Sequence, residues 1–184
     1  GDWSNSREFA NTGANPTVIF NGSRTQAYEH TGTATDYDFH NVSFRNTRPT
    51  IIGDQGSIIM ISDLAVTNQA DFAGNPDRNV INAIGNTFVM GPAAVFNNAY
   101  MGSNPTAVHR DYINGEVRRF YGTGTSYDFP VGDANSAEPL NLNFSGDPGN
   151  VDYIDATYDA AAPAQLNAGA AQSSWLCGNA SMDG

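Results

Sequence analysis

The 184-residue sequence contains no lysine and only one cysteine. Its 8 basic residues are therefore all arginine, against 19 acidic residues, and the formal net charge is −11. A chain without a basic surface does not neutralise nucleic-acid phosphates or dock on anionic lipid, so we expect neither kind of partner. The single Cys177 excludes a disulfide framework, and its neighbours Trp175 and Leu176 are typical of a small buried hydrophobic residue.

Long hydrophobic runs are also missing. The densest run, at 57–61, has the length of a strand, whereas a membrane-spanning helix needs roughly 18 apolar residues. We therefore expect no membrane insertion. The first residues do not have the charged and then apolar pattern of a leader, so we expect no signal peptide in this stretch. We expect it to be a piece of a longer mature protein.

Residues that favour helices are scarce, and the polarity comes instead from 21 Asn, 14 Thr and 19 Gly. This composition favours strands and turns. Glycine–asparagine pairs such as 85–86 and 114–115 indicate turns between short strands. The expected strands are 17–20, 37–44, 50–52, 57–61, 79–84, 87–90, 93–96, 117–121, 140–144 and 151–158. The sequence therefore predicts an all-β protein.

Two runs favour a solenoid over hairpins. Strict alternation in 38–44 places Phe39 with Asn41 and Ser43 on one face, opposite Val42 and Phe44. The run 57–61 is instead apolar on both faces, as in a strand without a wet side. We therefore predict a right-handed parallel β-helix over residues 15 to 120. The residues expected to be buried are Ile52, Ile58, Met60, Val89 and Phe129.

The composition changes near residue 130. Dense short strands precede it, and more widely spaced strands follow, with an alanine-rich stretch at 160–172 that Pro163 and Gly169 make more typical of a loop. We predict a β-helical stalk over residues 1–129 and a β-rich, sandwich-like module over 130–184, the latter truncated.

Several blocks of the chain resemble secreted and cell-surface modular proteins of Bacteroidetes that are exported by the type IX secretion system. The resemblance spans roughly residues 15 to 160 and is most specific in its last two blocks. Its blocks are 17–26 (TVIFNGSRTQ), 37–44 (YDFHNVSF), 86–91 (NTFVMG), 112–119 (YINGEVRR) and 127–133 (YDFPVGD).

The resemblance implies a right-handed β-helical stalk leading into a β-rich module, with extracellular or cell-surface display in adhesin-like proteins. It supplies no catalytic motif. Two departures are evident: Glu116 stands where the pattern often has proline, and the C-terminal sorting domain of an exported chain is not present in the sequence.

Catalytic motifs are not evident. His30, His40 and His109 are scattered without metal-ligand spacing, and no nucleophile elbow, zinc-protease or phosphate-loop motif occurs. An enzyme that acts on acidic sugars needs cationic side chains, and the sequence has two arginine pairs, Arg45 with Arg48 and Arg118 with Arg119, with no pattern that joins an aspartate to either. We therefore expect a protein that is not an enzyme.

Carboxylates are the plentiful reactive groups, and they gather in two loops. Calcium takes six to eight oxygen ligands, so these loops are the best candidate metal sites, and solvated acidic loops are the simpler interpretation. Neither loop has EF-hand spacing. The candidate calcium ligands are Asp133, Asn135 and Glu138 in the first loop, and Asp147 and Asp152 in the second, which also contains Asn150 and Asp155.

Three functions stay open at this point. The first is a non-catalytic structural or adhesive module of a larger extracellular protein, with other modules of the same or a neighbouring surface protein as partners. The second is a carbohydrate-binding or carbohydrate-active β-helix with a polysaccharide partner. The third is a self-assembling filament subunit. Apart from a calcium ion, no cofactor is expected.

Overall fold

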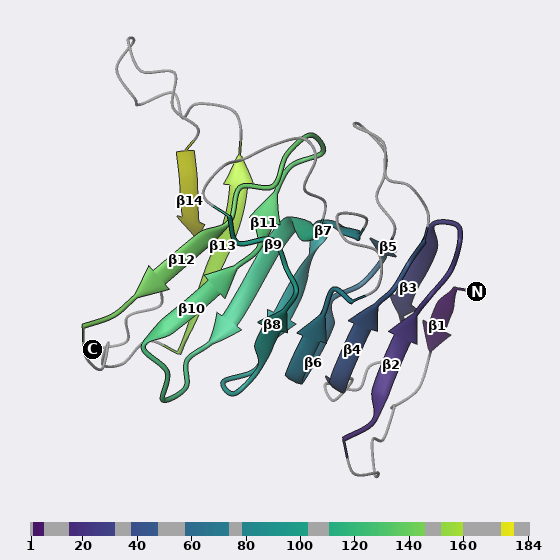
Figure 1. Cartoon of the computed structure of the whole chain (residues 1–184), viewed down its shortest axis with the longest axis horizontal. Coiled ribbons are helices and arrows are strands. Elements are labelled where there is room, and N and C mark those ends of the chain that lie inside the picture. Colours follow the sequence, from purple (N-terminus) through teal and green to yellow (C-terminus); the bar gives the residue numbers. More distant parts are fainter. Residues whose placement is uncertain are drawn as a thin grey trace.

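The computed structural model describes residues 2–5, 15–31, 38–47, 58–73, 79–102, 111–145, 152–159 and 174–178, the last segment as backbone alone. The described residues form strands and turns without a helix (Figure 1), which confirms the all-β prediction. None of them forms a helix that can cross a membrane. The strands are β1 (Trp3–Asn5), β2 (Thr17–Phe20), β3 (Gln26–His30), β4 (Asp38–Phe44), β5 (Ile58–Met60), β6 (Leu64–Asp71), β7 (Val80–Met90), β8 (Val95–Asn97), β9 (Tyr112–Phe120), β10 (Ser126–Phe129), β11 (Val131–Gly132), β12 (Leu140–Asn143), β13 (Tyr153–Asp159) and β14 (Ser174–Gly178).

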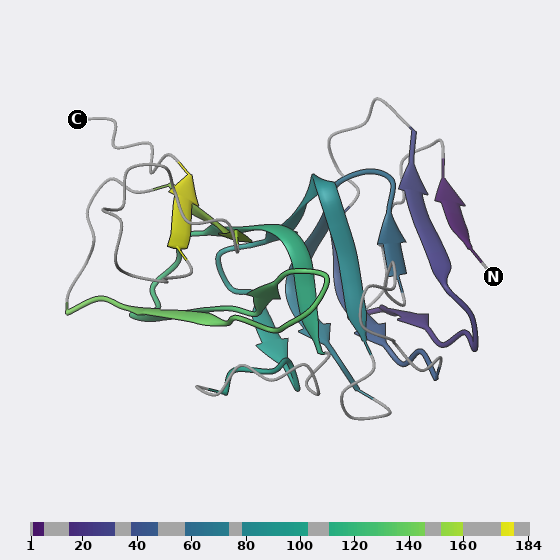
Figure 2. The same ribbon diagram turned by 90° about the horizontal axis from the view of Figure 1, so that it is seen from above.

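Most of these strands belong to one curled sheet, which bends round on itself in Figure 2. All described pairings among β1 to β9 are parallel. The curl arises because one strand changes neighbours along its length. The first half of β7 pairs with β5, whereas its second half pairs with β6. The prediction of parallel strands over this region is thereby confirmed.

Residues that pair in parallel strands are about 30 positions apart in the sequence, and we call each such stretch one turn of the chain. Tyr28 pairs with Met60, 32 residues later, and Val42 pairs with Ala70, 28 residues later. Three ladders result. The first joins β1, β3, β5, β7, β9 and β11; the second joins the first half of β6 to the second half of β7 and then to β9; the third joins β2, β4, β6 and β8.

The sheet bends sharply between the first and second ladders. In register, Ala83 pairs with Gly115 and Thr87 pairs with Glu116, so β7 carries three extra residues, 84–86, where β9 carries none. Gly115 makes this possible because its φ is +141°, and a Cβ there would lie 2.7 Å from the Ala83 carbonyl carbon. The extra residues 84–86 project as a bulge, which we call the β7 bulge.

Aromatic side chains stack through the centre of the curled sheet. Phe20 packs on Phe44 at 5.7 Å between ring centroids, Phe44 on Phe72 at 5.3 Å, and Phe72 on Phe96 at 6.4 Å. The four residues lie in consecutive turns of the chain. They belong to one hydrophobic core that extends to Phe129. Lateral stacking of like residues therefore supports the parallel register.

The expected burial is confirmed for three of the five named residues. Ile58, Met60 and Phe129 are buried. Val89 is only half-buried, so that prediction was wrong: its neighbours in β7 point inwards and it faces the outer side. Ile52 lies outside the described residues.

Strict alternation in β4 was also wrong. Phe39 is buried together with Val42 and Phe44, although strict alternation places Phe39 on the opposite face from both. The pairing with β6 shifts register between Phe39 and Asn41. This irregularity turns the chain at a corner of the sheet and brings Phe39 to the inner face.

The pairing changes from parallel to antiparallel across β9. On one side β7 runs parallel to β9, and on the other side β13 runs antiparallel to it. β14 continues the antiparallel sheet, and β10 with β12 forms a separate antiparallel pair. Val131 and Ala156 nevertheless share the core of the earlier strands. The division at residues 129 and 130 into two modules stays a prediction.

Candidate functional site

An open groove of about 430 Å³ lies on the outer side of the sheet, where β7, β9 and β13 meet. Its volume falls within the range of roughly 300–1,000 Å³ that is usual for small-molecule sites. One wall is the β7 bulge, the floor is the bend of β9, and the other wall is the end of β13. The lining residues are Ile84, Gly85, Asn86, Thr87, Asn114, Gly115, Glu116, Thr157 and Tyr158.

The β7 bulge is held by side chains on both flanks. The Asn82 Oδ1 accepts a hydrogen bond from the Ile84 backbone N–H at 3.2 Å, and Asn86 Nδ2 donates to the Met60 carbonyl at 2.9 Å. Gly85 has a φ of +82°, a conformation that glycine adopts without steric cost. The wall of the groove is therefore preformed.

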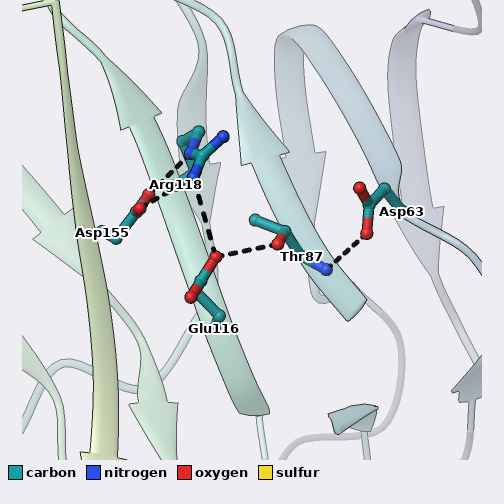
Figure 3. Close-up of polar contacts among 5 residues, drawn as sticks. All are labelled: Asp63, Thr87, Glu116, Arg118 and Asp155. Carbon is teal, nitrogen blue, oxygen red and sulfur yellow. Dashed lines mark hydrogen bonds and ion pairs between the residues drawn. The ribbon is translucent and has the colours of Figure 1, made fainter. Parts of the chain in front are cut away.

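A chain of polar contacts crosses the strands beside the groove (Figure 3). Asp63 Oδ1 accepts from the Thr87 backbone N–H at 2.7 Å, and the Thr87 hydroxyl donates to Glu116 Oε1 at 2.8 Å. The same Glu116 oxygen lies 4.0 Å from Arg118, which donates to both oxygens of Asp155 at 2.7 and 2.8 Å. Four strands or strand ends are thus joined on one face.

The strongest member of this chain is the Arg118–Asp155 pair, which joins β9 to β13. It is bidentate, and the Asp155 side chain is only 11% exposed. The hydrogen bonds to Asp155 raise the pKa of Arg118 above its ordinary value, against the opposing effect of burial. The guanidinium also lies 4.2 Å from the centroid of the Tyr153 ring. Arg118 is therefore committed to this internal contact.

Asn114 has a different environment. It lines the groove and is only 8% exposed, yet no side-chain hydrogen bond to it is found among the described residues. The polar atoms of its amide are not fully enclosed, so they are reached by solvent from the groove rather than by a protein partner. Glu116 is beside it in the groove, with a side chain that is 40% exposed. Asn114 therefore presents an unused donor and an unused acceptor to the groove.

A second polar feature, which we call the asparagine column, consists of Asn46, Asn79 and Asp111. All three are buried, at 0%, 0% and 5% exposure. Asn46 donates its side-chain amide to the Arg24 carbonyl at 2.8 Å and its backbone N–H to Asn79 Oδ1 at 3.1 Å. Asn79 in turn donates its backbone N–H and its Nδ2 to Asp111 Oδ1 at 3.1 and 3.3 Å. Successive turns of the chain are thus joined by side chains.

Arg119, the neighbour of Arg118, points into the core. It donates to the carbonyls of Ala94 and Asp128 and lies 5.4 Å from the ring centroids of both Phe96 and Tyr127. Burial lowers the pKa of Arg119 below its ordinary value, partly offset by Asp128. Neither arginine of this pair is therefore placed as the cation of an acidic-sugar site.

The first predicted calcium loop is ordered by its own side chains. Asp133 Oδ1 accepts from the backbone N–H groups of Asn135 and Ser136 at 2.7 and 2.9 Å, and Glu138 Oε1 accepts from the Ser136 hydroxyl at 3.0 Å. Asn135 itself is exposed. An Asx turn of this kind explains the acidic residue without an ion.

The second predicted loop is described only in part. Asp147 and Asn150 lie outside the described residues, and Asp152 is exposed immediately before β13. Asp155 pairs with Arg118 instead of facing a metal. The described residues contain no group of three or more His, Cys, Asp or Glu side chains that could hold a metal ion. The calcium sites stay a prediction.

The remaining candidates from the sequence do not meet in space within the described residues. His30 is buried in β3, and His40 in β4 lies 3.5 Å from the Thr67 hydroxyl. His109 lies outside the described residues, and nothing is described of the Cys177 side chain in β14.

The groove residues were not singled out from the sequence as a site. The available signal was the pair of glycine–asparagine dipeptides at 85–86 and 114–115, which were interpreted as turns between strands. In the structure both lie within strands, at the bend where β7 and β9 pair. No family model, curated protein or solved structure matches the chain.

Proposed function

We propose that the chain is a non-catalytic structural or adhesive module of a larger extracellular or cell-surface protein, built as a right-handed parallel β-helix. The three ladders support this fold because their partners recur once per turn of the chain. A solenoid of this kind gains its stability from contacts between neighbouring coils, which suits it to a stiff stalk or display module.

The asparagine column is the observation that carries the proposal. Its side chains satisfy backbone groups of the next coil at buried positions, with spacings of 33 residues from Asn46 to Asn79 and 32 residues from Asn79 to Asp111. Buried polar networks that are satisfied in this way fix one register of stacking. The asparagine column therefore supports the proposal that this chain is a scaffold of stacked turns.

The engaged carboxylates support a non-catalytic role. Asp63, Asp133 and Asp71 accept hydrogen bonds from protein groups: a strand N–H, a loop turn, and the side chains of Ser43 and Asn98. A catalytic carboxylate needs instead an oxygen turned to substrate and a partner that adjusts its protonation. Asp63 and Asp71 join neighbouring turns of the chain, and Asp133 holds its own loop.

The surface location rests on the resemblance to Bacteroidetes cell-surface proteins in residues 15 to 160. Antibodies raised against the purified chain would test it on cells of the source organism. We expect labelling of intact cells that is lost after brief protease treatment from outside. Labelling that appears only after the cells are permeabilised contradicts the proposal.

Turnover assays test the non-catalytic part separately. The purified chain should release no new reducing or unsaturated ends from neutral or acidic polysaccharides. Saturable cleavage that is abolished by changing one groove carboxylate, Glu116→Gln, would show an enzyme and overturn the proposal.

A further inference from the structure

We infer that the groove between β7, β9 and β13 binds a short segment of an uncharged glycan. This binding site goes beyond the scaffold role and does not depend on it, because a glycan site can occur on an enzyme or on a stalk. The inference starts from Asn114, a residue that is only 8% exposed, lines the groove and has no side-chain hydrogen bond among the described residues.

An amide that faces a groove without a protein partner is free to exchange its water for the hydroxyl groups of a ligand. Protein–ligand hydrogen bonds formed there do not have to break an existing internal bond of Asn114. Asn86 adds an amide oxygen beside it, because only its Nδ2 is used, in the bond to the Met60 carbonyl. Glu116 adds the carboxylate oxygen that neither Thr87 nor Arg118 contacts. The groove thus offers several unused acceptors and one donor amide on fixed strands.

Tyr158, which also packs against the hydrophobic core, lines the opposite wall with part of its aromatic surface. A pyranose ring carries C–H groups on its faces and hydroxyls around its rim. It can therefore pack on an aromatic ring while its hydroxyls bond amides and carboxylates. Ile84, which is 65% exposed at the tip of the β7 bulge, extends this apolar surface.

Charge selects an uncharged sugar over an acidic one. Among the described residues, those that line the groove include a carboxylate, Glu116, and none of them is cationic. The nearest arginine, Arg118, is held by both oxygens of Asp155. A uronic acid would bring a second negative charge next to Glu116, in a chain whose net charge is already −11. A neutral hexose or pentose chain meets no such repulsion.

The groove is also preorganised. Its bulge is fixed by Asn82 and Asn86, and its floor is a bend that only glycine at 115 permits. Sites built on strands that are already held in place lose little conformational entropy on binding. The site therefore does not need a closing loop.

Isothermal titration of the full chain with cellohexaose, xylohexaose, mannohexaose and hexagalacturonic acid tests the inference. We expect saturable binding of at least one neutral hexasaccharide, with the acidic probe at least tenfold weaker. Asn114→Ala should weaken that binding about tenfold, the loss expected for one hydrogen bond to the ligand. Tyr158→Ala should weaken it further, whereas Tyr158→Phe, which keeps the ring, should retain most of it.

Asn97→Ala is the matched control, because Asn97 is an exposed asparagine on β8 that does not line the groove. It should bind as the unchanged chain does. Thermal melts of all variants report folding, and Tyr158→Phe and Asn114→Ala give two independent readouts if Tyr158→Ala fails to fold. No binding of any neutral probe at millimolar concentration overturns the inference. So does binding that Asn114→Ala leaves unchanged, or tighter binding of hexagalacturonic acid. Any of these results leaves the scaffold proposal standing.

Discussion

Several buried side chains in this protein join successive turns of the chain. Asn79 is the clearest case, since it accepts a hydrogen bond from Asn46 in the preceding turn and donates to Asp111 in the following turn. Its side chain links neighbouring turns by hydrogen bonds, as backbone groups do between paired strands. The sequence showed abundant asparagine but not which asparagines are buried, because that depends on contacts more than 30 residues apart.

Replacing Asn79 should therefore be costly. Asn79→Ala leaves the Asn46 N–H and an Asp111 oxygen with one partner fewer in a buried site, and we expect a loss of roughly 2–4 kcal/mol in the free energy of unfolding. Urea unfolding measures it. The control Asn97→Ala, at an exposed position, should stay within about 0.5 kcal/mol of the unchanged chain. Equal effects of the two variants would contradict a stabilising asparagine column.

The two glycines with positive φ at the bend should differ from each other. Gly85→Ala meets open space and costs only the strain of its backbone conformation, roughly 1–2 kcal/mol. Gly115→Ala also places its Cβ 2.7 Å from the Ala83 carbonyl carbon, so it should cost more. Urea midpoints of the two variants give the comparison. A smaller loss for Gly115→Ala would show that β9 does not approach β7 as closely as described.

At the scale of strands, the attachment of β13 to β9 is reinforced by one side-chain ion pair, between Arg118 and Asp155. Asp155 is 11% exposed in a bidentate contact with Arg118, which is 31% exposed. Because the arginine is partly in water, the loss on Asp155→Ala should be about 1–3 kcal/mol, below that of a fully buried pair. In Asp155→Ala, hydrogen exchange should become faster in the β13 amides and stay unchanged in those of β3. The control is Asp152→Ala, which changes an exposed aspartate immediately before the same strand and should alter neither exchange rate.

The strands could be predicted from the sequence where β-branched and aromatic residues dominate. β2 was predicted with its observed limits, and β5 and β12 to within a residue at each end. β6 was missed because Leu64–Asp71 contains Ala, Asn and Gln, which have little intrinsic preference for strands; its neighbours β4 and β7 impose the conformation.

The bends explain the remaining errors. Asn114 and Gly115 have the signature of a hairpin turn, so β9 was expected to begin only at residue 117, yet it begins at Tyr112 and turns inside the strand. Likewise 79–84 and 87–90 were expected as separate strands and form one, β7. The groove lies at this bend. Its position follows from register between β7 and β9, which local patterns do not contain.

For the whole molecule, the net charge can be calculated directly from the sequence. A net charge of −11 on 184 residues causes self-repulsion in the compact state, and salt screens it. We expect the urea midpoint at pH 7 to rise between 10 and 200 mM NaCl. Near pH 5, closer to the sequence pI of about 4.3, the rise should shrink because fewer carboxylates are charged. A fall in the midpoint with salt at pH 7 would show that internal ion pairs outweigh the repulsion.

The sequence separation between paired strands also determines how long each strand waits for its later partner during synthesis. Tyr28 of β3 finds its partner Met60 in β5 only after 32 further residues have been made, and Ile81 of β7 waits equally long for Ile113. At roughly 5–20 residues per second, the edge of each strand that faces its later neighbour stays unpaired for about 2–6 seconds until that neighbour is translated. Each new strand of the first ladder therefore meets an edge that is already in place, and we expect this ladder to assemble from β1 towards β9 during synthesis.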